Sequence, residues 1–497
     1  MKKSVLFILV LMCQGINAQS NAERLDLWQY QKNKRLFVPQ QMTFLVGQTE
    51  EYGKLQLEYQ KTSGDFRKSQ QAEEQRLYQF DVEGFTDIDR FKAYGRFTFG
   101  IRHEDGLAND LRSGKKDEFQ PFYYYANFPN NIQNQQYFAT TMFSYEIVRN
   151  KLYGGFGIDF DYNWTTGNRD PRPDITNYFI RYKWDLTYRL NKHLIGIGYA
   201  MGRTSEDMNE MMFKNSEIMA GNKYPDRFVN VSLGYGDIVL SSNNRKLERD
   251  GHENRFNIAY QYSAEQLEVL LYADKKDYRE NAELNKASEA FSVYNKYNND
   301  QISFKSLVTY KATEKNNYQF GLEYYNYQGQ NKRTVEGINY EANHSLFTGL
   351  FQASYLSLWK DVDMEFGLTE QLESTERKDF AVGNKLKYQG LLSSVHINAI
   401  YHQNNGFYRM SLMPMYRMKM TNNKDLEPTQ ETNFTKQVIL PDFNYNSQNV
   451  FGLRGEIGYG TKALINKYYL YFSLGYQHFG ADSQSRNTLT ASVNMYL

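Results

Sequence analysis

Histidines are the side chains most able to act as general bases or metal ligands, and their spacing decides whether they do. None of the seven belongs to an HExxH pair, and the chain has no Gly-x-Ser-x-Gly nucleophile elbow. On a strand, His396 and His402 would share one face about 20 Å apart, too far to bind one metal ion. The best acid–base candidate is the run His103-Glu104-Asp105, whose alternative interpretation is a solvated cluster at a strand end. We therefore predict no catalytic residue, no metal site and no cofactor.

A cluster of aromatic residues could bind a ligand instead. Tyr123, Tyr124 and Tyr125 end an aromatic run that begins at Phe119, inside a long polar stretch. Exposed rings of this kind favour sugar stacking or partner docking, whereas a loop folded over an opening would bury them. The Asp-Pro-Arg-Pro stretch 170–173 predicts a rigid turn that supports such a lid. We predict contact with cargo or a partner for the three tyrosines and, more weakly, for Arg172.

Composition excludes several classes of protein. The 58 Lys+Arg residues balance 57 Asp+Glu residues, so the basic excess of a nucleic-acid-binding protein is absent. One cysteine excludes a disulfide framework, and the 16% aromatic content excludes a disordered chain. Residues 1–18 combine a basic start, a short apolar core and a small Ala18. This pattern predicts an export signal peptide that is cleaved after Ala18.

Strict alternation of apolar and polar residues dominates the rest of the chain. In 152–164 the even positions are apolar or aromatic except for glycine, while Asp159 and Asp161 occupy odd positions. The stretch 176–190 repeats the pattern, with Arg181 and Lys183 on the polar face. Successive side chains of a strand point to opposite faces, so these segments predict strands with one apolar and one charged face.

Three further features favour a membrane barrel over a soluble sandwich. The expected strands have about 10 to 13 residues, which suits a tilted crossing of a bilayer. Aromatic residues flank the apolar rows, as in the interfacial girdles of outer-membrane proteins. Tight turns also alternate with long polar stretches, as in barrels with short periplasmic turns and long extracellular loops. The long stretches are 105–136, 205–226, 275–300, 329–344 and 419–448.

We therefore predict an all-β fold, a closed antiparallel transmembrane β-barrel over residues 52–497. Counting segments gives about 20 strands, if residues 234–237 form a turn between strands 227–235 and 237–246. If that stretch is a bulge within one strand, the count becomes 18. Pro414 lies inside an expected strand, where its missing N–H predicts a bulge or distorted pairing.

The end of the chain alternates most clearly. Val493, Met495 and Leu497 are apolar, with polar residues between them. An apolar terminal strand of this kind predicts an assembly signal that the barrel assembly machinery reads. It also predicts that outer-membrane lipid surrounds the protein. Residues 19–51 show loose helical spacing and predict a periplasmic or lumenal segment, much smaller than the plug domain of an active transporter.

Charges of both signs occupy the expected lumen face. They suit either a hydrated wall without strong ion selectivity or an interlocked wall that closes the pore. A barrel of this size needs loops or residues 19–51 to seal it, because porins of 16–18 strands leave an aqueous channel. The residues concerned are Lys54, Glu58, Arg102, Asp159, Asp161, Arg181, Lys183, Asp185 and Arg189.

Several motifs occur in the order found in a known family. They are Gly-Asp-Phe-Arg at 64–67, Glu-Gly-Phe at 83–85, the strand 95–100, the aromatic run 121–127 and Arg-Asp-Pro-Arg at 169–172. With them, the chain resembles an uncharacterised outer-membrane β-barrel family of the Bacteroidota. The resemblance implies a gene neighbourhood with a TonB-dependent transporter and a surface lipoprotein, and it supplies no functional residues.

Together these observations predict a non-enzymatic outer-membrane barrel in nutrient or metal uptake, either a channel or an accessory receptor beside a TonB-dependent transporter. Two alternatives stay open. One is an outer-membrane hydrolase with a site at the extracellular rim, and the other is a scaffold barrel for a surface assembly.

Overall fold

The computed structural model describes residues 29–114, 117–209, 224–240, 245–286, 292–333, 337–359, 361–427, 432–462 and 468–497. The expected signal peptide, residues 1–18, lies outside the described residues. Among those that are described, no helix is both long and apolar enough to cross a membrane.

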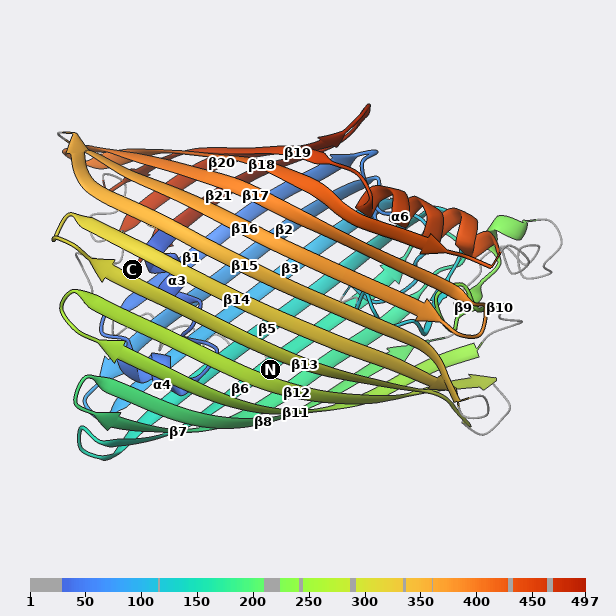
Figure 1. The fold of residues 1–497 in the computed structure, drawn as a ribbon, viewed down its shortest axis with the longest axis horizontal. Helices are drawn as coiled ribbons and strands as arrows, with labels where there is room; N and C mark the ends of the chain where they lie inside the picture. The colour runs from blue at the N-terminus through green and yellow to red at the C-terminus, as the bar shows by residue number, and fades with distance from the viewer. Residues whose placement is uncertain are drawn as a thin grey trace.

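The architecture is a closed antiparallel transmembrane β-barrel of 18 strands (Figure 1). Each strand pairs with its neighbours along the chain, and β21 closes the ring by pairing with β1 in a regular antiparallel register. The barrel strands are β1 Tyr52–Gly64, β2 Glu74–Ile88, β3 Phe91–Leu107, β5 Asn130–Val148, β6 Leu152–Gly167, β7 Asp174–Leu190, β8 His193–Met208, β11 Arg245–Ser263, β12 Leu267–Lys286, β13 Ser292–Lys311, β14 Asn316–Arg333, β15 Gly337–Trp359, β16 Val362–Asp379, β17 Asn384–Gln403, β18 Gly406–Asp425, β19 Val450–Thr461, β20 Tyr469–Ala481 and β21 Gln484–Tyr496.

The remaining elements lie inside the barrel or at its ends. They are α3 Gln29–Arg35, α4 Met42–Gly47, β4 Tyr123–Tyr125, η1 Pro225–Arg227, β9 Asn230–Ser232, β10 Ile238–Leu240, η3 Thr435–Ile439 and α6 Leu440–Asn446. One rim of the barrel, on the left in Figure 1, carries tight turns such as 149–151, 191–192 and 404–405. We call it the short-turn rim, and the opposite end, where α6, β9 and β10 lie, the long-loop rim (Figure 1).

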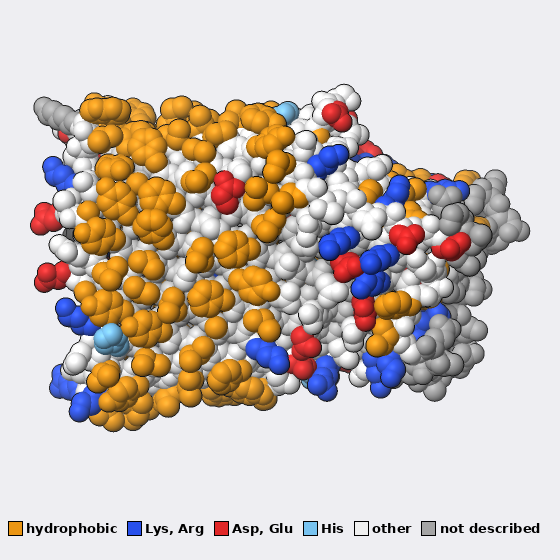
Figure 2. Space-filling model, in the orientation of Figure 1, with side chains coloured by type: hydrophobic (Ala, Val, Ile, Leu, Met, Phe, Trp, Pro, Cys, Tyr) orange, Lys and Arg blue, Asp and Glu red, His pale blue; other side chains and the backbone are white. Residues whose placement is uncertain are grey.

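Alternation along the strands produces an apolar belt around the barrel (Figure 2). On β7, Trp184 and Leu186 face outward and are 41% and 45% exposed, whereas Lys183 and Thr187 face the lumen and are buried. This arrangement confirms the predicted fold class, since lipid-facing and lumen-facing residues alternate in transmembrane barrels.

The expected count of 20 strands is wrong, and the alternative count of 18 is observed for a different reason. Residues 234–237 do form a turn, but the strands on either side of it, β9 and β10, are not part of the barrel. They form a separate three-stranded sheet with β4. Alternation of apolar and polar residues indicates a strand with two different faces. It does not distinguish a strand of the barrel wall from a strand of a small sheet packed inside the barrel.

The prediction of long loops is wrong for two of the stretches. Residues 275–286 and 292–300 extend β12 and β13, and most of 329–344 extends β14 and β15. Strands of up to 23 residues therefore continue past the apolar belt. Beyond the belt the outer face of a strand meets water instead of lipid, so the outward positions are no longer apolar although the hydrogen-bonded ladder continues.

Pro414 lies in β18, between β17 and β19. Its partner on β19 is Leu453, in an unbroken register. On the β17 side the pairing runs from Ser394–Met415 directly to Ile397–Leu412, so the ladder is interrupted beside Pro414. The predicted distortion is confirmed, and it occurs where the missing N–H would have donated.

Residues 29–51, which we call the lumenal segment, occupy the lumen near the short-turn rim. Their apolar side chains form two clusters with lumen-facing residues of the wall. The first cluster joins Val38, Met42, Leu45 and Val46 to Tyr52, Phe85, Tyr94, Met142, Tyr153 and Leu194. The second joins Phe37 and Phe44 to Ala259, Leu270, Tyr272 and Leu307. Burial of this apolar area fixes the segment across the lumen.

Candidate functional site

Loops at the long-loop rim fold into the lumen and form what we call the loop plug. It comprises residues 65–73, 108–114, 117–129, 224–240 and 432–449. Its centre is the small sheet in which β4 pairs with β9, residue 123 opposite 232 and residue 125 opposite 230. The plug lies at the end of the barrel opposite the lumenal segment (Figure 1).

The three tyrosines expected to contact cargo lie inside this plug. Tyr123, Tyr124 and Tyr125 are 6%, 1% and 1% exposed. Tyr123 and Tyr125 pack against Phe434 and the helical turns that follow it, while Tyr124 packs on the opposite side of β4. Direct contact between these rings and a ligand would require the plug to move.

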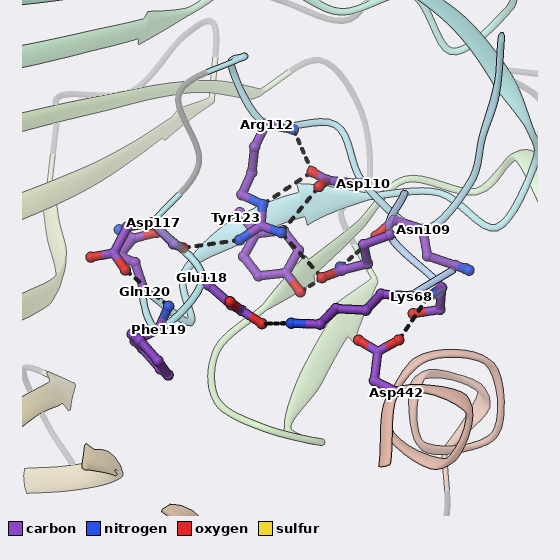
Figure 3. Close-up of polar contacts among 12 residues, drawn as sticks. Lys68, Asn109, Asp110, Arg112, Asp117, Glu118, Phe119, Gln120, Tyr123 and Asp442 are labelled. Carbon is purple, nitrogen blue, oxygen red and sulfur yellow. Dashed lines mark hydrogen bonds and ion pairs between the residues drawn. The ribbon is translucent and has the colours of Figure 1, made fainter. Parts of the chain in front are cut away.

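Arg112 ties the plug together (Figure 3). Its guanidinium donates to both carboxylate oxygens of Asp110, over 3.1 and 3.0 Å, and lies 4.1 Å above the ring of Tyr123. It also donates to Gln70 Oε1 over 3.1 Å, which joins the β1–β2 loop to the β3–β5 loop within the plug. Burial alone would lower the pKa of Arg112, but the Asp110 carboxylate raises it above its ordinary value. The guanidinium is therefore a permanent cation in this network.

A second ionic group joins the plug to the barrel wall, and we call Lys68, Glu118 and Arg377 the latch. The Glu118 carboxylate forms an ion pair with the Lys68 ammonium (Figure 3). It also lies 3.5 Å from Arg377 Nη2 on β16. Burial opposes ionisation of Glu118, but the two cations outweigh it and lower the pKa of Glu118 to about 2. Glu118 thus remains a carboxylate throughout the physiological range of pH.

Arg377 also holds the β9–β10 turn. Its guanidinium carbon lies 5.0 Å from the ring centres of Phe119 and Tyr235, which is cation–π distance for both. Next along β16, the Asp379 carboxylate accepts hydrogen bonds from the backbone N–H of Tyr235 and of Asp237, over 2.5 and 3.1 Å. One stretch of the wall therefore positions two loops of the plug.

Polar contacts complete the attachment of the lumenal segment on the side of β14–β16. The Asn33 amide donates to Gln319 and Gln352, each over 3.1 Å, and the backbone N–H of Gln29 donates to Glu365 over 3.1 Å. Lys34 pairs with Glu268 over 2.9 Å. The segment is therefore held by polar contacts with the wall as well as by its two apolar clusters.

Between the two seals, charged side chains of the wall reach solvent inside the barrel. Lys305 and Glu323 form a 2.9 Å ion pair on the lumen face, and they are 32% and 41% exposed. Glu373 is 39% exposed, and Glu118 of the latch is 50% exposed. Exposure of these lumen-facing groups indicates a hydrated space within the barrel.

Other parts of the wall are interlocked. Asp159 binds both Arg181 and Lys183, over 2.9 and 2.7 Å, and Arg181 also pairs with Glu253 over 2.7 Å. The two predicted arrangements of the lumen face, a hydrated wall and a wall of interlocked charges, therefore both occur, on different strands. The wall of β6, β7 and β11 is neutralised, while that of β13, β14 and β16 meets water.

The remaining candidates do not form a joint site. On β3, Glu104 faces the lumen and accepts a hydrogen bond from Asn134 over 2.6 Å, whereas its neighbours His103 and Asp105 alternate to the other face. Within the described part of the chain, no three His, Cys, Asp or Glu residues are grouped as metal ligands. Arg172 is paired with Asp170 over 2.6 Å, in a loop separate from the three tyrosines.

The latch could not be found from the sequence. Lys68, Glu118 and Arg377 come from three distant segments, and none of them belongs to a motif with a known chemical role. The sequence indicates only that Lys68 and Glu118 lie at the same end of the barrel, because the β1–β2 and β3–β5 connections are both at the long-loop rim.

A family model matches residues 42–497. The chain belongs to DUF6850, a family of unknown function. This match confirms that the family is uncharacterised, whereas the bacterial group and the gene neighbours stay predictions. No curated protein sequence matches this DUF6850 member.

Several solved structures are similar to this DUF6850 barrel at low identity. The copper transporter OprC has a TM-score of 0.47 and 8% identity over 87% of this chain, which spans 62% of that protein's length. The ferric preacinetobactin receptor BauA of Acinetobacter baumannii has a TM-score of 0.38 and 9% identity over 90% of this chain and 80% of its own. The ferripyoverdine receptor of Pseudomonas aeruginosa has a TM-score of 0.39 and 9% identity over 90% and 72%. Similarities at this level identify no shared ligand or activity.

Proposed function

We propose that this protein is a non-enzymatic barrel of the outer membrane that acts in nutrient or metal uptake, with a lumen that conducts solute when both the loop plug and the lumenal segment move. In this proposal the long-loop rim faces the outside of the cell and the short-turn rim faces the periplasm. The lumenal segment then guards the inner end and the loop plug the outer end.

The observation that carries this proposal is the hydrated interior between the seals. A purely anchoring barrel needs no wide lumen, because about eight strands already fill their interior with side chains. Here a wall of 18 strands keeps ion pairs such as Lys305–Glu323 exposed to internal water. A polar, water-filled interior is the property that a solute pathway requires.

The contacts of the plug with the wall also suit a seal that opens. The latch and the Arg377–Phe119–Tyr235 stack are charge-assisted or cation–π contacts, and the Glu118 carboxylate is already half exposed. Groups of this kind exchange a protein partner for water at modest cost. Opening must also separate an apolar cluster that joins the plug to β7, β8, β11 and β12.

Planar-bilayer recording of the purified full-length protein tests the proposal. We expect brief conductance steps from a mainly closed state, with weak selectivity between cations and anions because the wall carries both signs of charge. Liposome swelling with neutral sugars would then give the size limit of the solute. A protein that never conducts, even when the latch is removed, would exclude the channel.

A second function is favoured by the seal at the short-turn rim. There the lumenal segment buries ten apolar wall residues, which is a firm closure. That observation supports an accessory receptor that passes cargo to a TonB-dependent transporter, together with a surface lipoprotein. Co-purification of those partners from native membranes, with no conductance from the isolated barrel, would favour it.

A further inference from the structure

One sector of the lumen wall carries arginines without matching carboxylates. Along residues 406–417 of β18 and the whole of β19, β20 and β21, all of which the structure describes, Glu456 is the only acidic residue. Strand parity turns the arginines of these strands into the lumen, because Met410, Tyr416 and Leu453 beside them are exposed on the lipid face. We call these arginines the arginine strip: Arg409, Arg417, Arg454 and Arg486.

The strand register spreads the strip along the lumen. On β19, Arg454 lies opposite Met413, which is four positions from both Arg409 and Arg417 on β18. Each of these steps corresponds to ~13 Å along the strands. β18 begins at the short-turn rim, and Arg486 reaches the loop plug, where it donates to a backbone carbonyl of the β1–β2 loop over 3.0 Å. The strip therefore extends from near the short-turn rim to the underside of the plug.

Near the short-turn rim, the cations of the strip outnumber their partners. Arg409 pairs with Glu456 over 3.3 Å. Arg454 is exposed to the lumen, and no described residue forms an ion pair or hydrogen bond with it. Lys32 of the lumenal helix α3 lies in the same space: burial lowers its pKa from the ordinary value, and repulsion from Lys54, Arg409 and Arg454 lowers it further. The charge of Arg454 is therefore left without a counter-charge.

Carboxylates on neighbouring strands are already engaged. Glu365 on β16 is completely buried and accepts hydrogen bonds from the backbone N–H of Gln29 and from Ser354 Oγ, each over 3.1 Å. On β2, Asp81 pairs with Arg96 over 2.8 Å. Neither carboxylate lies within ion-pair distance of the strip.

At its other end the strip lines a cavity of about 240 Å³ between the plug and the wall. Arg417 donates to the backbone carbonyl of Tyr445 over 2.7 Å, and its Nε is buried without a hydrogen-bond partner. Carbonyl acceptors are neutral, so they leave the charge of the guanidinium uncompensated. The cavity also presents aromatic rings and one carboxylate; these lining residues are Phe66, Tyr445, Phe479 and Glu373.

We propose that the arginine strip binds the carboxylate or sulfate groups of an organic anion with a ring-shaped body, such as an acidic oligosaccharide, during its passage through the lumen. The proposal rests on the function proposed above and names the class of cargo. Guanidinium forks match the geometry of such anionic groups, and the aromatic faces of the cavity suit stacking on a ring. Arginines ~13 Å apart cannot share one carboxylate, which favours a solute with several anionic groups.

Binding of such a solute is compatible with weak selectivity between small ions. Small ions also pass the opposite side of the lumen, where Glu323 and Glu373 are exposed. They therefore meet both signs of charge. A larger anion is selected only if it touches the strip.

Isothermal titration of the full-length protein in detergent tests the proposal. Trigalacturonate, with three carboxylates, should bind, and the neutral sugar maltotriose of similar size should not. Arg454→Gln should weaken binding of trigalacturonate by at least about ten-fold, because a charge-assisted hydrogen bond is lost. Arg454→Lys should restore part of the affinity, since a point charge replaces the fork. The substitution breaks no contact with the described residues, so the fold should be unaffected.

Lys305→Gln is the matched control, because it removes another exposed, lumen-facing cation, on β13 away from the strip. It should bind trigalacturonate as the wild type does. Equal binding of maltotriose, or an Arg454→Gln variant that binds normally, would overturn the proposal. Inorganic sulfate bound as tightly as trigalacturonate would also overturn it, because the site would then recognise charge alone.

Titration and conductance separate this inference from the proposed function. A protein that binds trigalacturonate but never conducts would refute the channel and leave the strip intact. A conducting barrel that binds neither sugar would refute the strip and leave the channel intact. Because a closed plug could exclude the solute, Glu118→Gln is titrated as well. Absence of binding in both the wild type and this variant would overturn the strip.

Discussion

The latch offers the most direct test of how the lumen is closed. Replacing Glu118 by Gln keeps the shape of the side chain and removes its charge. Lys68 and Arg377 would then face one another across the seam between plug and wall without the carboxylate that neutralises them. We expect the plug to leave the wall more often, because like charges repel and the ionic contact between Glu118 and Arg377 is lost.

The size of the effect follows from the pKa of Glu118. Lowering it from an ordinary 4.5 to about 2 corresponds to ~3 kcal/mol of favourable interaction. Lys68, which supplies the larger part, lies in the plug with Glu118, and the Glu118 side chain is half exposed, so the part that holds the plug to the wall is ~1 kcal/mol. Each ~1.4 kcal/mol is a factor of ten in an equilibrium, so the open fraction should rise about five-fold.

Single-channel recording at neutral pH measures that fraction directly. Glu323→Gln is the matched control, since it also removes a half-exposed carboxylate from an ion pair inside the lumen, but between two neighbouring wall strands. If the two variants open equally often, the latch does not hold the plug and our account of it is wrong.

The pH dependence provides a second check on the same group. A carboxyl whose pKa is lowered by folding stabilises the folded form above its ordinary pKa and loses that contribution as the pH falls through the lowered value. The latch should therefore remain closed from neutral pH to about pH 4, and weaken as the pH approaches the pKa of about 2. Opening of the wild type near pH 5–6 would contradict the role of Glu118.

Other predictions concern assembly, burial and chemistry. Deletion of Val493–Leu497 should abolish insertion into the outer membrane, assayed by heat-modifiable mobility, because β1 would lose closing partners and expose unpaired backbone groups to lipid. Leu186→Arg should cost ~2–4 kcal/mol in unfolding titrations in lipid, since its side chain is 45% exposed on the outer face. Alanine at all three of 123–125 should leave the barrel assembled but disrupt the plug and raise basal conductance, because the three rings are buried in it. His103→Ala should change neither conductance nor any hydrolysis, and loss of a measurable hydrolysis would revive the enzyme alternative.

The barrel was predictable because its constraint is local. In β6 and β7 each residue faces either lipid or lumen, so chemistry alternates with position and can be read within one strand. The same reasoning failed for β9 and β10, which belong to a small sheet packed in the plug and not to the barrel wall. Near the long-loop rim the same reasoning predicted loops where there are strands, since β12 and β13 continue after the alternation of apolar and polar residues has ended.

The latch was not predictable for a different reason. Lys68 and Glu118 are 50 positions apart, and Arg377 is 259 positions from Glu118, so only closure of the barrel brings them together.

The pairing of β1 with β21 has a consequence for the order of folding. These strands are more than 400 residues apart, so the ring closes late, at the largest loop-closure cost in the sheet. A segment that spans the interior cannot easily be threaded into a finished ring. The helices α3 and α4 must therefore pack against the sheet before β21 pairs with β1. The contacts of the lumenal segment with β11–β13 then form early, and they set the curvature of the sheet before the ring closes.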